Sequence, residues 1–399
     1  MKKKSILITV SAVFIVFPIV FILLFFNSKK FTVGFYSLSD FEVSTIQANI
    51  NEIFPEEKVD FVVLDNSKNI EEQLIALPKK INLLFAPDGI ALRQAQTFLE
   101  SLDENILSKV SSTLRESFKM SDDALTCLPV ALETFEILIK KDIFNSKELK
   151  QIQNLNQLIE VMTYSSDFMK FPVCLDGADD QTLFFFVSML MSLNGNTAEA
   201  EGFELLKNEI NLKKNCPPEL KTALDNAVEL KKKGLLHPEW IRLTKKDMQA
   251  FMEFNSCAVG LLSTTTHVNL SKEVLSKFRC LGTPQLYDME KKLIPTRIIC
   301  VAKPVNEKSG DDLSAKADKI IEFFTGDEGQ AKLCNSLGLS PVNVESSASD
   351  PYLLLGRYWV ASAKLANPTI EKMLYDNLKD MKLFAEEIRR YILVDGFGY

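Results

Sequence analysis

The segment that decides the fold is residues 31–89, FTVGFYSLSDFEVSTIQANINEIFPEEKVDFVVLDNSKNIEEQLIALPKKINLLFAPDG. Short apolar runs rich in β-branched residues predict strands at Phe31–Ser37, Val59–Leu64 and Ile81–Ala86. The stretches between these runs have the spacing of amphipathic helices. A β-α-β-α-β order predicts a parallel sheet with right-handed crossovers, which places the chain in the α/β class.

The same alternation continues along the rest of the 399 residues, a length that predicts two or three compact units. Apolar runs predict further strands at Phe171–Leu175, Cys257–Leu262 and Arg297–Ala302. Helical spacing predicts helices at Thr182–Leu193, Pro217–Gly234, Lys245–Phe254, Ala315–Thr325 and Glu328–Leu337. Apolar residues recur every three or four positions from Ile370 to Ile392, which predicts one long amphipathic helix.

The N-terminus carries a long uncharged apolar run, residues 6–26, between Lys2–Lys4 and Lys29–Lys30. A helix of this length spans the ~30 Å hydrocarbon core of a membrane. The run ends in bulky Leu and Phe residues where a signal peptidase needs small side chains, which favours an uncleaved anchor over a cleaved signal. The lysines on the short side predict a cytoplasmic N-terminus and an exported body.

Composition excludes several classes of function. A net charge of −7 has the wrong sign for a nucleic-acid binder, which gains affinity through Lys and Arg. Only two histidines occur, and the seven cysteines stand singly in the sequence. We therefore expect no metal site, no cofactor and no catalytic nucleophile, and we expect several free thiols.

Ligands of open α/β sheets bind at the carboxyl ends of the strands. This rule selects five polar residues: Ser37, Asp40, Asp88, Thr264 and Thr265. Their hydroxyls and carboxylates can exchange hydrogen bonds with a polar ligand. The threonine run 264–266 is equally compatible with an ordinary polar turn. The acidic loop DGADD, residues 176–180, is compatible with a cation site, but a helix N-cap is the favoured interpretation.

Three further stretches carry a family resemblance. They are IIEFFTGDEGQAKLCNSLGLSPVN (residues 320–343), MQAFMEFNSCAVGLLS (248–263) and LPVALETFEILIKKDIF (128–144). Together they resemble motifs of the extracellular solute-binding proteins of ABC importers, in the sugar-binding group of maltose-binding protein. In that group the third motif crosses between two lobes, and the second leads into a ligand-side loop.

The resemblance implies a two-lobed periplasmic-binding-protein-like fold with a hinge between the lobes, preceded here by one transmembrane helix. The implied parts are an anchor (1–30), lobe 1 (31–126 plus 283–342) and lobe 2 (127–282 plus 343–399). The resemblance adds Glu133 and Asp180 as ligand-binding residues. Trp359 is either a stacking face for the ligand or a core residue. A tryptophan that often follows the second motif is absent, so the identity of the solute does not carry over.

The predicted function is solute capture at the outer side of the cytoplasmic membrane. The protein would bind a small polar solute, above all a carbohydrate, by lobe closure and deliver it to an ABC permease. The alternative is a scaffold of the same fold that acts as a sensor or as a protein-interaction module. A hydrolase is the third and least favoured class, because no nucleophile–base signature is present.

Overall fold

The computed structural model describes residues 30–76, 81–118, 125–144, 152–196, 201–282, 293–305, 311–363 and 365–397. The predicted anchor, residues 6–26, lies outside these ranges. Within them, no helix combines the length and the apolar character that crossing a membrane requires.

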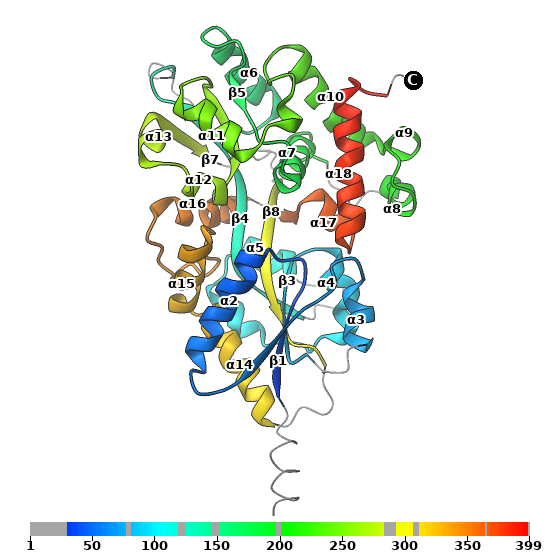
Figure 1. Cartoon of the computed structure of the whole chain (residues 1–399), viewed down its shortest axis with the longest axis vertical. Helices are drawn as coiled ribbons and strands as arrows, with labels where there is room; N and C mark the ends of the chain where they lie inside the picture. Colours follow the sequence, from blue (N-terminus) through cyan, green and yellow to red (C-terminus); the bar gives the residue numbers. More distant parts are fainter. Residues whose placement is uncertain are drawn as a thin grey trace, which may run out of the picture.

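The molecule consists of two lobes stacked along its long axis and joined by two long strands (Figure 1). These strands are β4 (Cys127–Lys140) and β8 (Leu293–Ala302). The first half of β4 pairs antiparallel with β8, and its second half pairs antiparallel with β6 (Val259–Ser263). Every residue of β4 is buried, so this strand passes through the interior from the first lobe into the second.

The first lobe contains the predicted parallel sheet. Strand β1 (Phe31–Phe35) lies between β2 (Val59–Val63) and β3 (Leu83–Pro87) and is parallel to both. Helices α2 (Asp40–Ile53) and α3 (Ile70–Ala76) connect them in sequence order. The predicted β-α-β-α-β unit is therefore confirmed, and β8 and β4 extend its sheet with antiparallel pairing.

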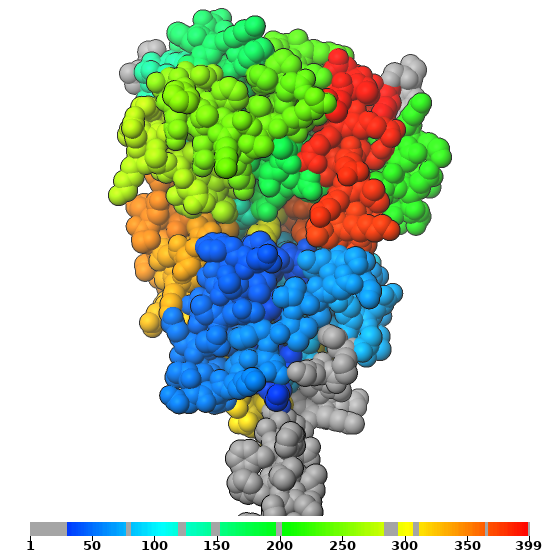
Figure 2. All heavy atoms as spheres, in the orientation of Figure 1, coloured from blue at the N-terminus to red at the C-terminus, as the bar shows by residue number. Residues whose placement is uncertain are grey.

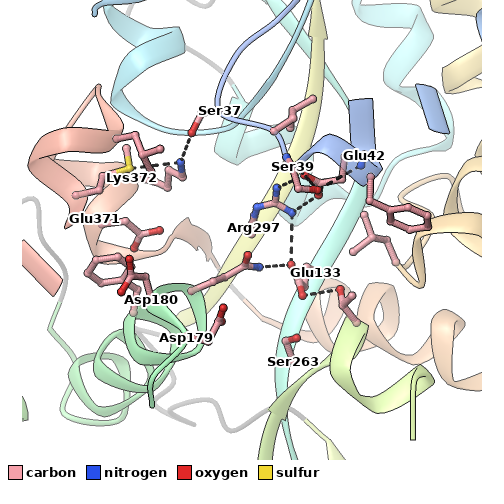
Figure 3. Close-up of a pocket in the computed structure, with 18 of the residues that line it drawn as sticks. Ser37, Ser39, Glu42, Glu133, Asp179, Asp180, Ser263, Arg297, Glu371 and Lys372 are labelled. Atoms are coloured by element: carbon pink, nitrogen blue, oxygen red, sulfur yellow. Dashed lines mark hydrogen bonds and ion pairs between the residues drawn. The ribbon is translucent and has the colours of Figure 1, made fainter. Parts of the chain in front are cut away.

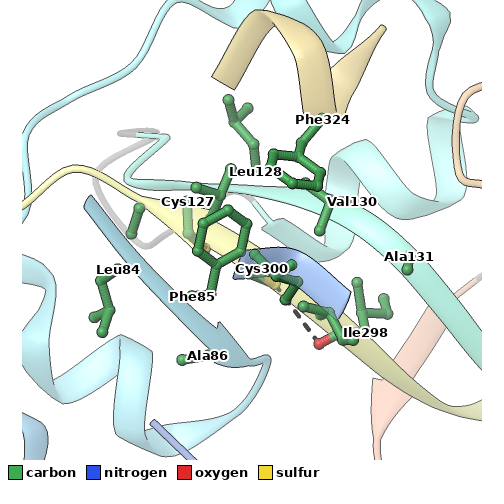
Figure 4. Close-up of a cluster of buried hydrophobic side chains, with 14 of the residues drawn as sticks. Leu84, Phe85, Ala86, Cys127, Leu128, Val130, Ala131, Ile298, Cys300 and Phe324 are labelled. Atoms are coloured by element: carbon green, nitrogen blue, oxygen red, sulfur yellow. Dashed lines mark hydrogen bonds between the residues drawn. The ribbon is translucent and has the colours of Figure 1, made fainter. Parts of the chain in front are cut away.

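Further elements of the first lobe are α4 (Ile90–Gln94), η1 (Ala95–Phe98), η2 (Glu104–Lys109), α5 (Ser112–Phe118), α14 (Asp311–Thr325), α15 (Asp327–Leu337) and β9 (Leu365–Pro368). Its core is apolar and tightly packed (Figure 4). Phe85 of β3 meets the edge of Phe324 of α14, with ring centroids 5.2 Å apart. Leu128 and Cys300, from β4 and β8, belong to the same fully buried cluster.

The second lobe is richer in helix. Its short strands are β5 (Val173–Cys174), β6 and β7 (Phe278–Gly282). Its helices before the return strand β8 are α6 (Leu155–Ser166), α7 (Asp180–Leu193), η3 (Glu201–Phe203), α8 (Glu204–Asn208), α9 (Leu212–Asn215), α10 (Pro218–Lys232), η4 (Trp240–Arg242), α11 (Lys245–Glu253), α12 (Thr264–Val268) and α13 (Lys272–Lys277). Helix α7 is buried from Thr182 onward and forms the centre of the lobe.

Two large hydrophobic clusters mark the two lobes. The first draws on residues from Phe31 to Leu132 and from Ile294 to Ala366, including Val360 of α16 (Pro351–Ser362). The second draws on residues from Phe135 to Leu261 and from Ile370 to Ile392. The clusters therefore change near residues 133 and 367, whereas two of the lobe boundaries predicted from the sequence fall at 126/127 and 342/343. Those boundaries stay a prediction.

The predicted long C-terminal helix is wrong in one respect. The structure divides it into α17 (Ile370–Leu374) and α18 (Leu378–Leu393). The side chain of Asn377 caps α18 by accepting the backbone N–H of Asp380 at 2.9 Å. The backbone N–H of Leu378 donates to the carbonyl of Asn66, in the other lobe, at 2.7 Å. A contact with the first lobe thus accompanies the break.

All seven cysteines lie in the described part of the chain, and all are free. Five are buried, as expected for cysteines that act as small apolar side chains. The Cys174 and Cys257 sulfurs are 3.1 Å apart in the second lobe.

Candidate ligand-binding site between the lobes

A cavity of about 430 Å³ lies between the two lobes. On the face seen in Figure 2, a furrow separates the blue helix α2 and its neighbours from the green and red segments of the second lobe. The polar side chains of the lining come from both lobes: Ser37, Ser39, Glu42, Asn66, Glu133, Asp179, Asp180, Gln181, Lys245, Ser263, Thr265, Arg297, Glu371 and Lys372. Apolar walls are added by Phe41 and Phe184.

The floor of the cavity is a buried network of charges centred on Arg297 of β8 (Figure 3). The Arg297 guanidinium makes a two-pronged ion pair with Glu42 of α2, at 2.7 and 2.9 Å. A longer contact of 3.5 Å joins Arg297 to Glu133 of β4. Burial by itself would raise the pKa of Glu42. The nearby Arg297 charge and the hydrogen bonds to Arg297 lower this pKa by more, so the net shift is downward. Glu42 is therefore held as a carboxylate.

Glu133 connects this network to the second lobe. Its carboxylate accepts a hydrogen bond from the Thr265 hydroxyl of α12 at 2.6 Å. It also accepts one from the side-chain amide of Gln181, on α7. Because Glu133 stands on the strand that crosses between the lobes, groups from both lobes meet at one buried carboxylate.

The lobes also touch directly at a second place. The Lys372 ammonium of α17 donates to the Ser37 hydroxyl, after β1, at 3.0 Å (Figure 3). Nearby, the Tyr36 hydroxyl donates to the backbone carbonyl of Asp376. Burial lowers the pKa of Lys372 to about 8. These contacts close one end of the cleft.

Helix α7 begins at the cavity, and the acidic loop 176–180 supplies its N-cap, Asp179, and its first residue, Asp180. The Asp179 carboxylate caps the helix by accepting the backbone N–H of Thr182 at 2.9 Å, so the helix-cap interpretation is correct. Asp180 forms an ion pair with Arg389 of α18 at 2.6 Å. Asp176 is fully buried, and within the described part of the chain neither of its carboxylate oxygens has a hydrogen-bond partner. Burial raises the pKa of Asp176 to about 7.

This burial predicts a pH-dependent stability. The folded protein keeps a proton on Asp176 at pH values where the unfolded chain has released it. The resulting stabilisation is complete below about pH 4 and is lost as the pH rises through about 7. The Asp176→Asn variant has no ionisable group at this position. Between about pH 4 and pH 8, its free energy of unfolding should therefore rise relative to that of wild type by on the order of 2–4 kcal/mol. Urea unfolding at several pH values measures this, with exposed Asp40→Asn as control. Parallel pH profiles for Asp176→Asn and wild type would refute it.

Four of the eight predicted site residues line the cavity. Ser37 and Asp180 reach it from the ends of β1 and α7, while Glu133 and Thr265 meet at its floor. Sequence reasoning thus brought together residues from both lobes. Their role in binding stays a prediction.

The structure places the other four away from the cavity lining. Asp40 is exposed at the start of α2. Asp88 is buried and accepts the backbone N–H of Ile298 at 2.9 Å, which holds β3 against β8. Thr264 accepts the backbone N–H of Thr134 at 3.1 Å and ties α12 to β4. Trp359 packs on the first hydrophobic cluster.

Sequence reasoning missed most charged groups of the lining. Glu42 had a recognisable signal, because Ser39 and Glu42 have the spacing of a capping box and form one. Arg297 stands in an apolar strand and gave no sign of a partner. Glu371 and Lys372 fall within the spacing that predicts one long amphipathic helix, which gives no sign of a site.

Comparison with known proteins establishes the fold. No family model and no curated protein matches the chain. Many solved structures do match. The bacterial solute receptor AcbH, described as preferring β-D-galactopyranose, has 15% identity and a TM-score of 0.69, covering 90% of this chain and 91% of its own. A putative binding protein of Bacillus subtilis in an open conformation has 13% identity and a TM-score of 0.68, covering 93% and 94%. Maltose-bound MalE3 of T. maritima has 14% identity and a TM-score of 0.59, covering 90% and 99%.

At these identities the likeness shows the fold, which is the two-lobed fold of solute-binding proteins. The resemblance inferred from the three sequence motifs is thus confirmed at the level of the fold. The chain therefore shares its fold with AcbH and MalE3 while its sequence has diverged far from both.

Proposed function

We propose that the protein is the solute-binding component of an ABC importer and captures a small carbohydrate between its lobes. The cavity carries this proposal. Its volume of about 430 Å³ falls within the ~300–1,000 Å³ usual for small-molecule sites. Its lining combines hydroxyls, amides, carboxylates and ammonium groups from both lobes, which suits a ligand that both donates and accepts hydrogen bonds.

The solved structures support the same class of ligand. AcbH is described with galactopyranose, MalE3 with maltose, and another neighbour as a chitin oligosaccharide binding protein. In the second lobe, Lys372 and Asp376 already contact the first lobe, which is the arrangement expected of a closed cleft. A hinge between the lobes would open the cleft to admit the solute.

A panel of sugars tests the proposal. A cognate sugar should raise the melting temperature, because binding only the folded form stabilises by about 2.7 kcal/mol at a hundredfold excess over Kd. It should also reduce the radius of gyration, since the closed lobes are more compact. Galactose, maltose and raffinose are suitable first probes. If sugars, amino acids and oligopeptides all leave both quantities unchanged, the sensor or interaction scaffold becomes the better account.

The proposal includes attachment to the cytoplasmic membrane through residues 6–26, with the soluble body on the extracytoplasmic side. The uncharged run and the lysines before it support this placement. Membranes washed with alkaline carbonate should retain the protein with its N-terminus intact. A soluble pool that begins near residues 27–31 would contradict the anchor.

A further inference from the structure

Glu371 is a buried carboxylate of the cavity wall with one unused oxygen. Glu371 is 4% exposed, and its Oε1 accepts a hydrogen bond from the Thr369 hydroxyl at 2.8 Å. Its other oxygen, Oε2, has no hydrogen-bond partner within the described residues. Figure 3 shows the Glu371 side chain projecting from α17 into the cavity. A buried acceptor left without a donor destabilises the fold, so this oxygen is suited to a donor on the ligand.

Lys372, the next residue, offers the complementary chemistry. Its ammonium has three donors, and it contacts the Ser37 hydroxyl at 3.0 Å and the Met381 sulfur at 3.5 Å. In the described part of the chain, no carboxylate lies within 4.0 Å of this ammonium. Within the described residues, the Lys372 ammonium therefore has no ion-pair partner.

The other charged groups of the lining are already engaged or balanced. Arg297 is held by Glu42, and Asp180 is held by Arg389. Glu133 accepts hydrogen bonds from Thr265 and Gln181. The remaining pair, Asp179 and Lys245, has one charge of each sign. Among the lining residues that the structure describes, Glu371 alone has a buried side-chain oxygen without a hydrogen-bond partner, and Lys372 stands next to it.

The charges of these two neighbours restrict the ligand. An ammonium group on the ligand would be attracted to Glu371 and repelled by Lys372, and a carboxylate would meet the reverse. A hydroxyl group is uncharged and both donates and accepts hydrogen bonds, so it satisfies either residue. Phe41 and Phe184 offer apolar surface to the C–H face of a sugar ring.

We infer that Glu371 and Lys372 form a subsite for two adjacent hydroxyl groups of an uncharged sugar. One hydroxyl donates to Glu371 Oε2, and its neighbour accepts from the Lys372 ammonium. This inference rests on the proposed function and deepens it, because it names neutral sugars as the ligand class and rejects amino sugars and sugar acids.

The test compares neutral and charged sugars on the full-length protein in detergent. The neutral probes are galactose, maltose and raffinose, and the charged probes are galactosamine and galacturonate. We expect at least one neutral probe to bind, and galactosamine and galacturonate to bind at least tenfold more weakly than it. Affinities come from titration calorimetry, with the melting temperature of each variant as a check on folding.

Two variants reverse one charge preference each. Glu371→Gln should weaken binding of the neutral probe at least tenfold. It should also raise the affinity for galacturonate relative to that for the neutral probe, because no negative charge at residue 371 then repels the carboxylate beside Lys372. Lys372→Met should improve galactosamine relative to the neutral probe. Such opposite shifts in the ratio of affinities would not arise from a general loosening of the cleft. Matched variants on the exposed face of α18, Glu386→Gln and Lys382→Met, should bind every probe as wild type does.

The outcomes separate the two levels of the proposal. If wild type binds a charged probe as tightly as the best neutral one, the inferred subsite is wrong while sugar capture stands. The same holds if both cavity variants keep wild-type affinities and ratios. If no probe of any charge binds wild type, the proposed sugar-binding function fails and the subsite fails with it.

Discussion

Arg297→Met should lower the free energy of unfolding by about 3–5 kcal/mol, the usual loss when one partner of a buried ion pair is removed. The Arg297 side chain is 10% exposed, and those of Glu42 and Glu133 are 10% and 2% exposed. Without the guanidinium, both carboxylates would stay buried without a compensating charge. Urea unfolding followed by circular dichroism measures the effect.

Two controls isolate the cause. Arg242→Met removes an equally short but exposed ion pair, 2.9 Å to Glu239, and should cost no more than about 1 kcal/mol. Adding Glu42→Gln to Arg297→Met should restore part of the lost stability, because one stranded charge disappears. If Arg297→Met is no less stable than Arg242→Met, the network contributes nothing to the fold.

The architecture of the first lobe could be predicted because its signals are local. Each strand of its parallel unit is a short β-branched run, and each crossover has its own helical spacing. The path of β4 is different, because Glu133, Thr134 and Glu136 are polar yet lie within a fully buried strand. Their burial depends on partners from distant elements, such as Arg297, which local sequence does not reveal.

The candidate site was predictable only in part for a related physical reason. The rule that ligands bind at the carboxyl ends of strands identifies polar residues near a sheet edge. It does not say whether each side chain forms its hydrogen bonds with a ligand or with the protein's own backbone. Asp88 satisfies the backbone of β8, and Thr264 satisfies the backbone of β4, so neither faces the cavity. Conversely, the apolar periodicity continues across Tyr375–Asn377, where the structure breaks the helix and presents Lys372 to the cleft.

The adjacent threonines 264 and 265 offer a matched pair for the central claim. Thr265 lines the cavity, whereas Thr264 is fully buried against Thr134 and outside the lining. A Thr→Val change removes the hydroxyl at either position and preserves the shape of the side chain. Loss of a hydroxyl that holds a ligand should cost on the order of 1–3 kcal/mol, roughly tenfold or more in Kd. Ser37→Ala removes a hydroxyl from the opposite lobe, and a solute held by both lobes should respond to it as well.

The most direct measurement is titration calorimetry with the sugar that most raises the melting temperature. The account predicts that Thr265→Val and Ser37→Ala each weaken binding about tenfold or more. It predicts that Thr264→Val binds with wild-type affinity, although it is less stable because it loses hydrogen bonds to Thr134. Wild-type affinity in both Thr265→Val and Ser37→Ala would contradict the claim that the cleft between the lobes holds the solute.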